Sequence, residues 1–140
     1  MKHKILIVDD EENVLFVVKA ALTRNYDVLT AAEGVAALEL IKREKPAFVF
    51  LDIKMPGLSG LEVLALIKET GASPVVWMLT GDEDLSMAVR TLETGASGYL
   101  TKPFDIERLR EVVRSALEVA EDKRQHDTSG DKPWRVKKNK

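Results

Sequence analysis

The chain alternates short apolar runs with longer amphipathic stretches over most of its length. Short runs rich in Val, Ile, Leu and Phe are typical of strands, whereas apolar residues spaced by three and four positions are typical of helices. The short runs predict strands at residues 4–8, 26–31, 47–51, 74–79 and 98–101. A helix is predicted after each strand, from the apolar positions Val14 to Leu22, Val35 to Ile41, Leu61 to Ile67, Leu85 to Leu92 and Ile106 to Ala120.

The alternation of strands and helices predicts an α/β protein, in which right-handed crossovers join parallel strands and helices cover both faces of the sheet. The first, third and fourth strands are almost continuously apolar, as expected for strands buried on both faces. The second and fifth strands carry polar residues such as Asp27 and Thr101, which suit the sheet edges. These features predict the strand order 2-1-3-4-5, a flavodoxin-like (βα)5 doubly wound sheet. Its ligand crevice is expected at the carboxyl ends of the strands, where the winding reverses between the first and third strands.

Composition agrees with one domain that has a sizeable core. The chain has 140 residues, of which 45% are hydrophobic and 31% charged, as is typical of globular domains. It contains no cysteine, which excludes disulfides, a thiolate nucleophile and a cysteine-based zinc site. No apolar stretch approaches the roughly 18 residues of a membrane span. We therefore expect a cytoplasmic protein without membrane contacts.

The last part of the chain differs from the rest. Residues 122–140 have no apolar period, contain Gly130 and Pro133, and carry more basic than acidic side chains. This composition predicts a disordered, partly basic tail or linker that follows a folded domain at residues 1–121. Because cations and anions are mixed in the tail, we assign it no nucleic-acid function.

Three carboxylates are expected at one end of the sheet. Asp9 and Asp10 follow the first strand and Asp52 follows the third, and neighbouring strands lie about 4.8 Å apart. Two such charges 4 Å apart repel by about 4 kcal/mol at an effective dielectric constant near 20. A site of this kind needs a cation or raised pKa values. Carboxylates, a carbonyl and several waters suit Mg²⁺.

Two further strand ends reach the same edge. The fourth strand is followed by Thr80, and the fifth ends at Thr101, directly before Lys102. A hydroxyl and an ammonium beside carboxylates and a metal ion suit phosphoryl transfer, in which one carboxylate becomes an aspartyl phosphate. The cation, Lys102 and Thr80 can then stabilise the phosphoryl oxygens.

Four sequence segments carry a resemblance to a known family. They are "ILIVDDE" (5–11), "FLDIKMPGLSG" (50–60), "MLTG" (78–81) and "GASGYLTKPFD" (95–105). In this order, and each at a strand end, they resemble the receiver domain of two-component response regulators over about residues 4–120. The segment "TGDEDLSMAVRTLETGASGYLTKPFD" (80–105) is particularly similar to receivers of the nitrogen-regulatory class.

The resemblance implies a phosphoacceptor site. Asp52 would accept a phosphoryl group from the phosphohistidine of a partner, either a sensor histidine kinase or a phosphotransfer protein. Asp9, Asp10, Asp52 and the backbone carbonyl of Lys54 would hold Mg²⁺. The protein would thus be a phosphorylation switch in a phosphorelay, not an enzyme with a separate substrate.

The resemblance also implies a switch. Lys102 and Thr80 would bind the phosphoryl oxygens, and the movement of Thr80 would let Tyr99 turn inward. This would remodel the face formed by the fourth helix, fifth strand and fifth helix, which is a possible homodimer surface. Without the resemblance, Tyr99 reads as a packing residue. The Lys102–Pro103 bond is expected to be cis, and no direct nucleic-acid binding by the receiver is expected.

Lys54 and Asp82 lie two positions beyond Asp52 and Thr80, where the resemblance implies that side chains tune dephosphorylation. Two other functions fit the sequence less well. A haloacid-dehalogenase-type phosphatase needs a second Asp two residues after its nucleophile, but Lys54 and Glu11 occupy the corresponding positions. A non-phosphorylated scaffold would normally lack part of the residue set, which is intact here. No effector domain is expected after the fifth helix, so the chain acts alone or is the receiver of a longer regulator.

Overall fold

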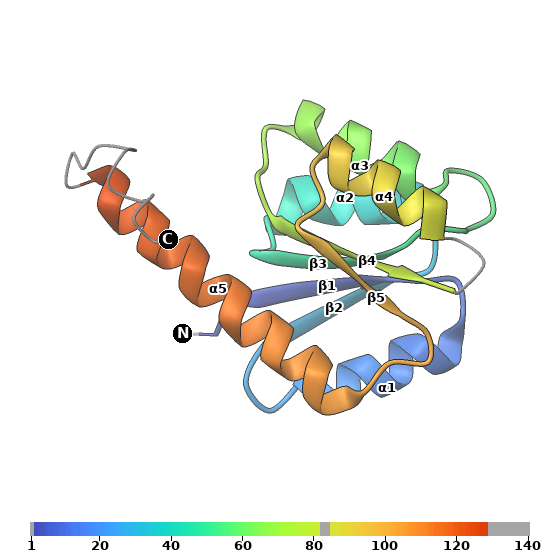
Figure 1. Ribbon diagram of the computed structural model, residues 1–140, viewed down its shortest axis with the longest axis horizontal. Coiled ribbons are helices and arrows are strands. Elements are labelled where there is room, and N and C mark those ends of the chain that lie inside the picture. The colour runs from blue at the N-terminus through green and yellow to red at the C-terminus, as the bar shows by residue number, and fades with distance from the viewer. Residues whose placement is uncertain (1, 82–84, 129–140) are drawn as a thin grey trace.

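The computed structural model describes residues 2–81 and 85–128, in which five parallel strands form one sheet. The order is β2-β1-β3-β4-β5, which confirms the predicted topology (Figure 1). Lys4 of the first strand lies opposite Asp27 of the second, and Thr80 of the fourth strand lies opposite Thr101 of the fifth. The strands are β1 (Lys4–Val8), β2 (Asp27–Ala31), β3 (Phe48–Asp52), β4 (Val75–Thr80) and β5 (Gly98–Thr101).

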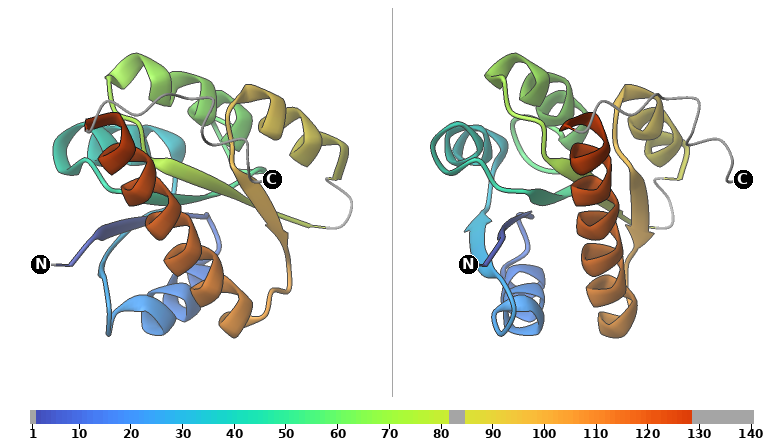
Figure 2. Two further views of the ribbon diagram at one scale, coloured as in Figure 1. Left: turned by 60° about the vertical axis from the view of Figure 1, so that its left-hand side comes forward. Right: turned by 90° about the vertical axis from the view of Figure 1, so that its left-hand side faces the viewer.

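Helices cover both faces of the sheet, as the views in Figures 1 and 2 show. One face carries α1 (Glu12–Leu22) and α5 (Ile106–Thr128). The other face carries α2 (Gly34–Glu44), α3 (Gly60–Ile67) and α4 (Leu85–Thr94), and a short 3₁₀ turn, η1 (Lys68–Thr70), follows α3. Gly95, directly after α4, has a φ of 130°, a backbone conformation that glycine adopts at little cost.

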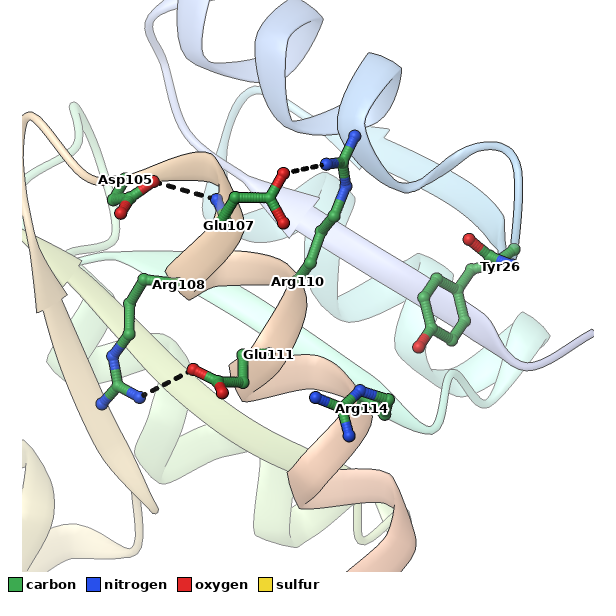
Figure 3. A pocket seen from close by; sticks show the side chains of 8 residues that line it. Tyr26, Asp105, Glu107, Arg108, Arg110, Glu111 and Arg114 are labelled. Atoms are coloured by element: carbon green, nitrogen blue, oxygen red, sulfur yellow. Dashed lines mark hydrogen bonds and ion pairs between the residues drawn. The ribbon is translucent and has the colours of Figure 1, made fainter.

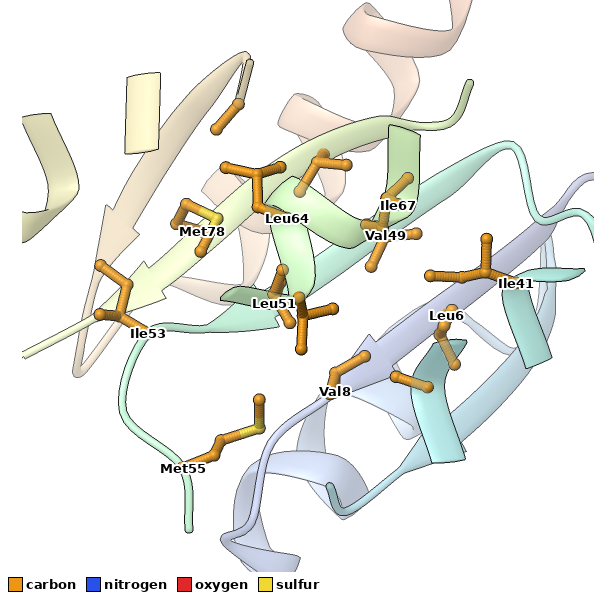
Figure 4. Close-up of a cluster of buried hydrophobic side chains, with 14 of the residues drawn as sticks. Leu6, Val8, Ile41, Val49, Leu51, Ile53, Met55, Leu64, Ile67 and Met78 are labelled. Carbon is orange, nitrogen blue, oxygen red and sulfur yellow. The ribbon is translucent and has the colours of Figure 1, made fainter. Parts of the chain in front are cut away.

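Alternate residues of the central strands point to opposite faces and form two separate cores. Leu6, Val49 and Met78 pack under α2, α3 and α4, as Figure 4 shows for Ile41, Leu64 and Ile67 from the helices. Ile7, Phe50 and Leu79 instead pack against α1 and α5. Because β1 and β3 are buried on both faces, their carboxyl ends are held rigidly in the middle of the sheet.

The start of α3 fixes the loop that follows β3. Ser59 Oγ accepts a hydrogen bond from the Glu62 amide at 3.2 Å, and Glu62 Oε1 accepts one from the Ser59 amide at 2.8 Å. This capping box satisfies amide groups that the first helical turn leaves without partners. The Gly60 amide donates to the Ile53 carbonyl at 2.7 Å, and a Cβ at Gly60 would clash with the Asp52 carbonyl oxygen. Glycine therefore lets α3 begin directly against the end of β3.

The fifth helix is longer than its apolar pattern predicts. Asp105, directly before α5, accepts a hydrogen bond from the Glu107 amide at 3.0 Å, as a residue that caps a helix does. The helix continues past Ala120 to Thr128 and so includes the first residues of the segment predicted as a tail. Residues 129–140 lie outside the described part of the chain. Among residues 2–81 and 85–128, no helix is long and apolar enough to span a membrane.

Candidate functional site

The carboxyl edge of the sheet gathers the side chains that the sequence places at the strand ends. Asp9 and Asp10 follow β1, Asp52 ends β3, and Lys102 follows β5. One carboxylate oxygen from each of the three aspartates lies within 4.8 Å of the others. We call these four residues the acidic site. The central strands thus bring together residues from three distant parts of the chain.

Lys102 places its ammonium among the carboxylates. Its Nζ lies 2.9 Å from Asp9 Oδ2, 3.6 Å from Asp52 Oδ1 and 3.3 Å from Glu11 Oε1. Burial alone would lower the pKa of Lys102, but the three neighbouring carboxylates outweigh this effect and raise it. Lys102 therefore stays protonated and supplies a fixed positive charge in the site.

Asp52 is almost fully buried, with 6% of its surface exposed. Burial raises the pKa of its carboxyl group to about 7, with a further upward contribution from the negative charge of Asp9, while Lys102 opposes the shift. Without an additional cation, burial therefore favours the protonated form of Asp52 more than in a solvated aspartate. A further positive charge nearby would favour the ionised, nucleophilic form.

Asp9 shows how a metal ion would fit this site. The residue is fully buried, and its Oδ1 accepts a hydrogen bond from the Glu11 amide at 2.9 Å. Apart from the ion pair with Lys102, its buried Oδ2 has no hydrogen-bond partner among the described residues. A buried carboxylate oxygen in this position, beside the exposed Asp10, can bind a hard divalent cation such as Mg²⁺. The residues thus fit the predicted metal ion.

Thr80 and Tyr99 take no part in the ion pairs of this centre that are described above. Thr80 is buried, and its hydroxyl donates to the Gly81 carbonyl at 3.0 Å instead of reaching the carboxylates. Tyr99 is half-buried and packs against the core under α4. The Lys102–Pro103 peptide bond is cis. Asp82 lies outside the described residues.

Lys54 is exposed and lines a hollow beside the acidic site. The hollow has a volume of about 480 Å³, and its lining also includes Asp10, Met55 and Met87. It opens next to the carboxylates between the β3–α3 loop and the first turn of α4. A ligand or partner group that approaches Asp10 from this side therefore passes Lys54.

Sequence reasoning missed one residue of the site. In the sequence, Glu11 indicates only that the phosphatase pattern is absent, yet its carboxylate contacts Lys102. The available signal was the third consecutive acid in "DDE" (9–11). A position directly after a strand end does not show where a long side chain points, so the contact with a lysine 91 positions away in sequence needed coordinates.

A larger hollow of about 740 Å³ lies elsewhere, between the α1–β2 turn and α5 (Figure 3). Charged residues of α5 dominate its walls, but they form ion pairs within the helix, Arg110 with Glu107 at 2.7 Å and Arg108 with Glu111 at 4.0 Å. None of the four residues of the acidic site lines it. We call it the α5 groove; it is lined by Asn25, Tyr26, Asp105, Glu107, Arg108, Arg110, Glu111 and Arg114.

Fold and site together define a doubly wound α/β protein with a carboxylate site of the metal-binding type at its topological switch point. A sequence model described as "Response regulator receiver domain" matches residues 5–114. The chain therefore belongs to the receiver-domain family of two-component response regulators.

Individual relatives agree with this assignment. Sporulation initiation phosphotransferase F of Bacillus subtilis (strain 168) is 35% identical over 118 residues, which cover 84% of this chain and 95% of that protein. The structure of NtrX from Brucella abortus matches with a TM-score of 0.85 and 35% identity, covering 91% of this chain and 30% of that one. A receiver domain protein from Clostridium thermocellum matches with a TM-score of 0.80 and 33% identity, covering 85% and 97%. The chain spans about half the length of several other curated relatives that it matches.

Proposed function

We propose that Asp52 is the phosphoacceptor of this receiver domain. It would take a phosphoryl group from the phosphohistidine of a sensor histidine kinase or a phosphotransfer protein. The observation that carries the proposal is the burial of Asp52 at the edge of the sheet, beside two further aspartates and one lysine. The name of the similar Bacillus subtilis protein, a phosphotransferase, supports the same class of reaction.

Mg²⁺ is the proposed cofactor, held by Asp9, Asp10, Asp52 and the backbone carbonyl of Lys54. The buried Asp9 Oδ2, which has no partner among the described residues apart from its ion pair with Lys102, and the cluster of carboxylate oxygens within 4.8 Å support this set. When bound, the ion would neutralise charge on the carboxylates and on the transferred phosphoryl group.

The chain's own residues perform the remaining steps. A carboxylate oxygen of Asp52 forms a bond to phosphorus while the phosphorus–nitrogen bond of the donor breaks, and the released imidazole nitrogen takes up a proton. The Lys102 ammonium, 3.6 Å from Asp52 Oδ1, lies close enough to contact a phosphoryl oxygen. The Thr80 hydroxyl must leave the Gly81 carbonyl before it can donate to another phosphoryl oxygen.

This movement of Thr80 supplies the proposed switch. Thr80 is the last residue of β4 and pairs with Thr101 of β5, two positions after Tyr99. A shift of Thr80 would therefore let Tyr99 move inward and change the α4-β5-α5 face, which would then bind an output partner or a second copy of the chain. A full switch needs about 5.5 kcal/mol of differential stabilisation, and the phosphoryl group adds about −1.5 to −2 charges that new contacts can use.

Finer assignments follow from the resemblance. We propose that the domain resembles receivers of the nitrogen-regulatory class, with support from the 35% identity to NtrX. Lys54 and Asp82 would tune dephosphorylation. The protein would act in the cytoplasm, as a switch and not as an enzyme with a separate substrate, and would not bind nucleic acid directly.

Labelling of the intact protein tests the proposal. Acetyl phosphate with Mg²⁺ should add one phosphoryl group to the wild-type chain, as measured by intact mass, and none to Asp52→Asn. A chelator should abolish the labelling. Asp27→Asn, which removes an exposed acid at the other end of the sheet, should label like the wild type. Equal labelling of Asp52→Asn and the wild type would refute the assignment.

A further inference from the structure

Glu11 shares the Lys102 ammonium with two aspartates. Its Oε1 lies 3.3 Å from Lys102 Nζ, closer than Asp52 Oδ1 at 3.6 Å. Glu11 and Lys102 come from different loops, since Glu11 directly precedes α1 and Lys102 directly follows β5. Glu11 thus ties the β5–α5 loop to the β1–α1 loop through the Lys102 ammonium.

The side chain of Glu11 has no role in the start of α1. Glu11 is the N-cap residue, but its carboxylate accepts no capping hydrogen bond from the helix. The backbone amide makes the contact with Asp9 Oδ1, and this contact remains after any substitution of the side chain except proline. A change of the Glu11 carboxylate therefore acts on Lys102 without removing a bond that supports the helix or Asp9.

A phosphoryl group on Asp52 would compete for the same ammonium. A lysine ammonium has three N–H donors, and each of the three carboxylates near it can occupy one. Asp9 is fully buried and held by the Glu11 amide, whereas the Glu11 side chain is 61% exposed. Glu11 is thus the carboxylate that can move into water at the lowest cost when the phosphoryl oxygens arrive.

We propose that Glu11 is a positioning residue that occupies one N–H donor of the Lys102 ammonium in the unphosphorylated state and releases it when the phosphoryl group binds. The inference rests on the proposed function of Asp52. It assigns one of the resting contacts of the lysine to a residue outside the metal-binding set. The holding contact opposes phosphorylation, so its removal makes the phosphorylated form easier to reach.

Two substitutions separate this contact from a general effect of charge. Glu11→Gln removes the charge, and Glu11→Asp keeps the charge but shortens the side chain by one methylene so that it no longer reaches Lys102. Both should bind beryllofluoride, a tetrahedral substitute for the phosphoryl group, roughly twofold to fivefold more tightly in the presence of Mg²⁺, as expected for one partly exposed ion pair. Both should also increase the rate of labelling by acetyl phosphate by a similar factor. Glu12→Gln, an exposed acid one residue further along, is the matched control and should match the wild type.

A second measurement needs neither metal nor phosphodonor. In the metal-free protein, the NMR signals of the Lys102 side chain should shift in both Glu11 variants at constant pH and stay in place in Glu12→Gln. Thermal unfolding should change little in Glu11→Gln, because no helix cap is lost. Glu11→Asp should be at least as stable as the wild type, because Asp is a favourable N-cap residue. The proposal is overturned if both Glu11 variants bind beryllofluoride like the wild type, or if only Glu11→Gln differs, which would indicate charge alone. Failure of the wild-type chain to label at Asp52 would instead overturn the proposed function.

Discussion

The acidic site and the α5 groove both gather charged side chains, but they differ in burial and in charge balance. In the acidic site Asp9 is fully buried, and three aspartates face one lysine. In the α5 groove, Arg108 and Glu111 are 55% and 60% exposed and neutralise each other. Exposed pairs keep most of their hydration and contribute little free energy, whereas buried unpaired charge must be offset by a ligand or by protonation. Unbalanced buried charge therefore distinguishes the acidic site from the α5 groove, although the groove is the larger of the two hollows.

Removal of the one cation of the acidic site should have the largest effect. Lys102→Met leaves the buried Asp9 Oδ2 without the one ion-pair partner that it has among residues 2–81 and 85–128, and the loss of one partner from a buried pair typically costs 3–5 kcal/mol. Asp52 can take up a proton and so offset part of the unbalanced negative charge, which places the expected loss at the lower end of this range. We expect the free energy of unfolding at pH 7 without metal to fall by about 3 kcal/mol. Urea titration measures this loss.

A lysine at the same contact distance provides the control. Lys4 Nζ lies 2.9 Å from Glu44 Oε1, as Lys102 Nζ lies 2.9 Å from Asp9 Oδ2, but the Lys4–Glu44 pair is 43% and 30% exposed. Lys4→Met should therefore lose much less stability than Lys102→Met. Equal losses in the two variants would show that burial does not distinguish the acidic site from an ordinary surface pair.

The pH dependence of stability should reveal the buried Asp52 carboxyl group. Burial raises its pKa to about 7, so between about pH 4 and pH 7 the folded chain binds a proton that the unfolded chain releases. The free energy of unfolding of the metal-free protein should therefore fall as pH rises through this window, by at most about 1.4 kcal/mol per pH unit from this group. Asp52→Asn lacks the group and should lose this slope.

Urea titrations at several pH values in the presence of a chelator measure the slope. Asp52→Asn should be more stable than the wild type at pH 8, and the difference should shrink toward pH 5. Asp27→Asn, which changes an exposed acid at the amino end of β2, should keep the slope of the wild type. If Asp52→Asn also keeps the slope of the wild type, the Asp52 carboxyl group has an ordinary pKa. The acidic site and the α5 groove then differ less than their burial indicates.

Much of this contrast is readable from the chain because topology acts on local patterns. The continuous apolar runs of β1, β3 and β4 placed these strands in the centre, and the polar residues of β2 and β5 placed those at the edges. Once the order is known, residues that follow β1 and β3 must meet at one edge. The convergence of Asp9, Asp10 and Asp52 therefore needed no information about side-chain packing.

Other features depend on packing and were not predictable from local patterns. Asp9 and Asp10 are adjacent in sequence, yet one is buried and the other exposed, because only the loop conformation decides which side chain turns inward. The contact between Glu11 and Lys102 joins two long side chains from separate loops. The continuation of α5 to Thr128 has no apolar stripe to indicate it, although Glu, Lys, Arg and Gln in this segment favour helix.

The smallest effects are expected in the α5 groove. Arg108→Met removes a 4.0 Å pair with Glu111 in which both side chains are more than half exposed, so the free energy of unfolding should change by less than about 0.5 kcal/mol. The change should be smaller still in 1 M salt, where the screening length is about 3 Å. Urea titration at low and high salt measures both values, and Glu111→Gln, which removes the other half of the pair, is the matched control.

Labelling of Asp52 by acetyl phosphate should be unaffected in both variants, because none of the four residues of the acidic site lines the groove. A loss above about 2 kcal/mol, which is outside the range of exposed pairs, or a change in labelling would mean that the groove also holds charge that matters to the site, and burial would no longer separate the two regions.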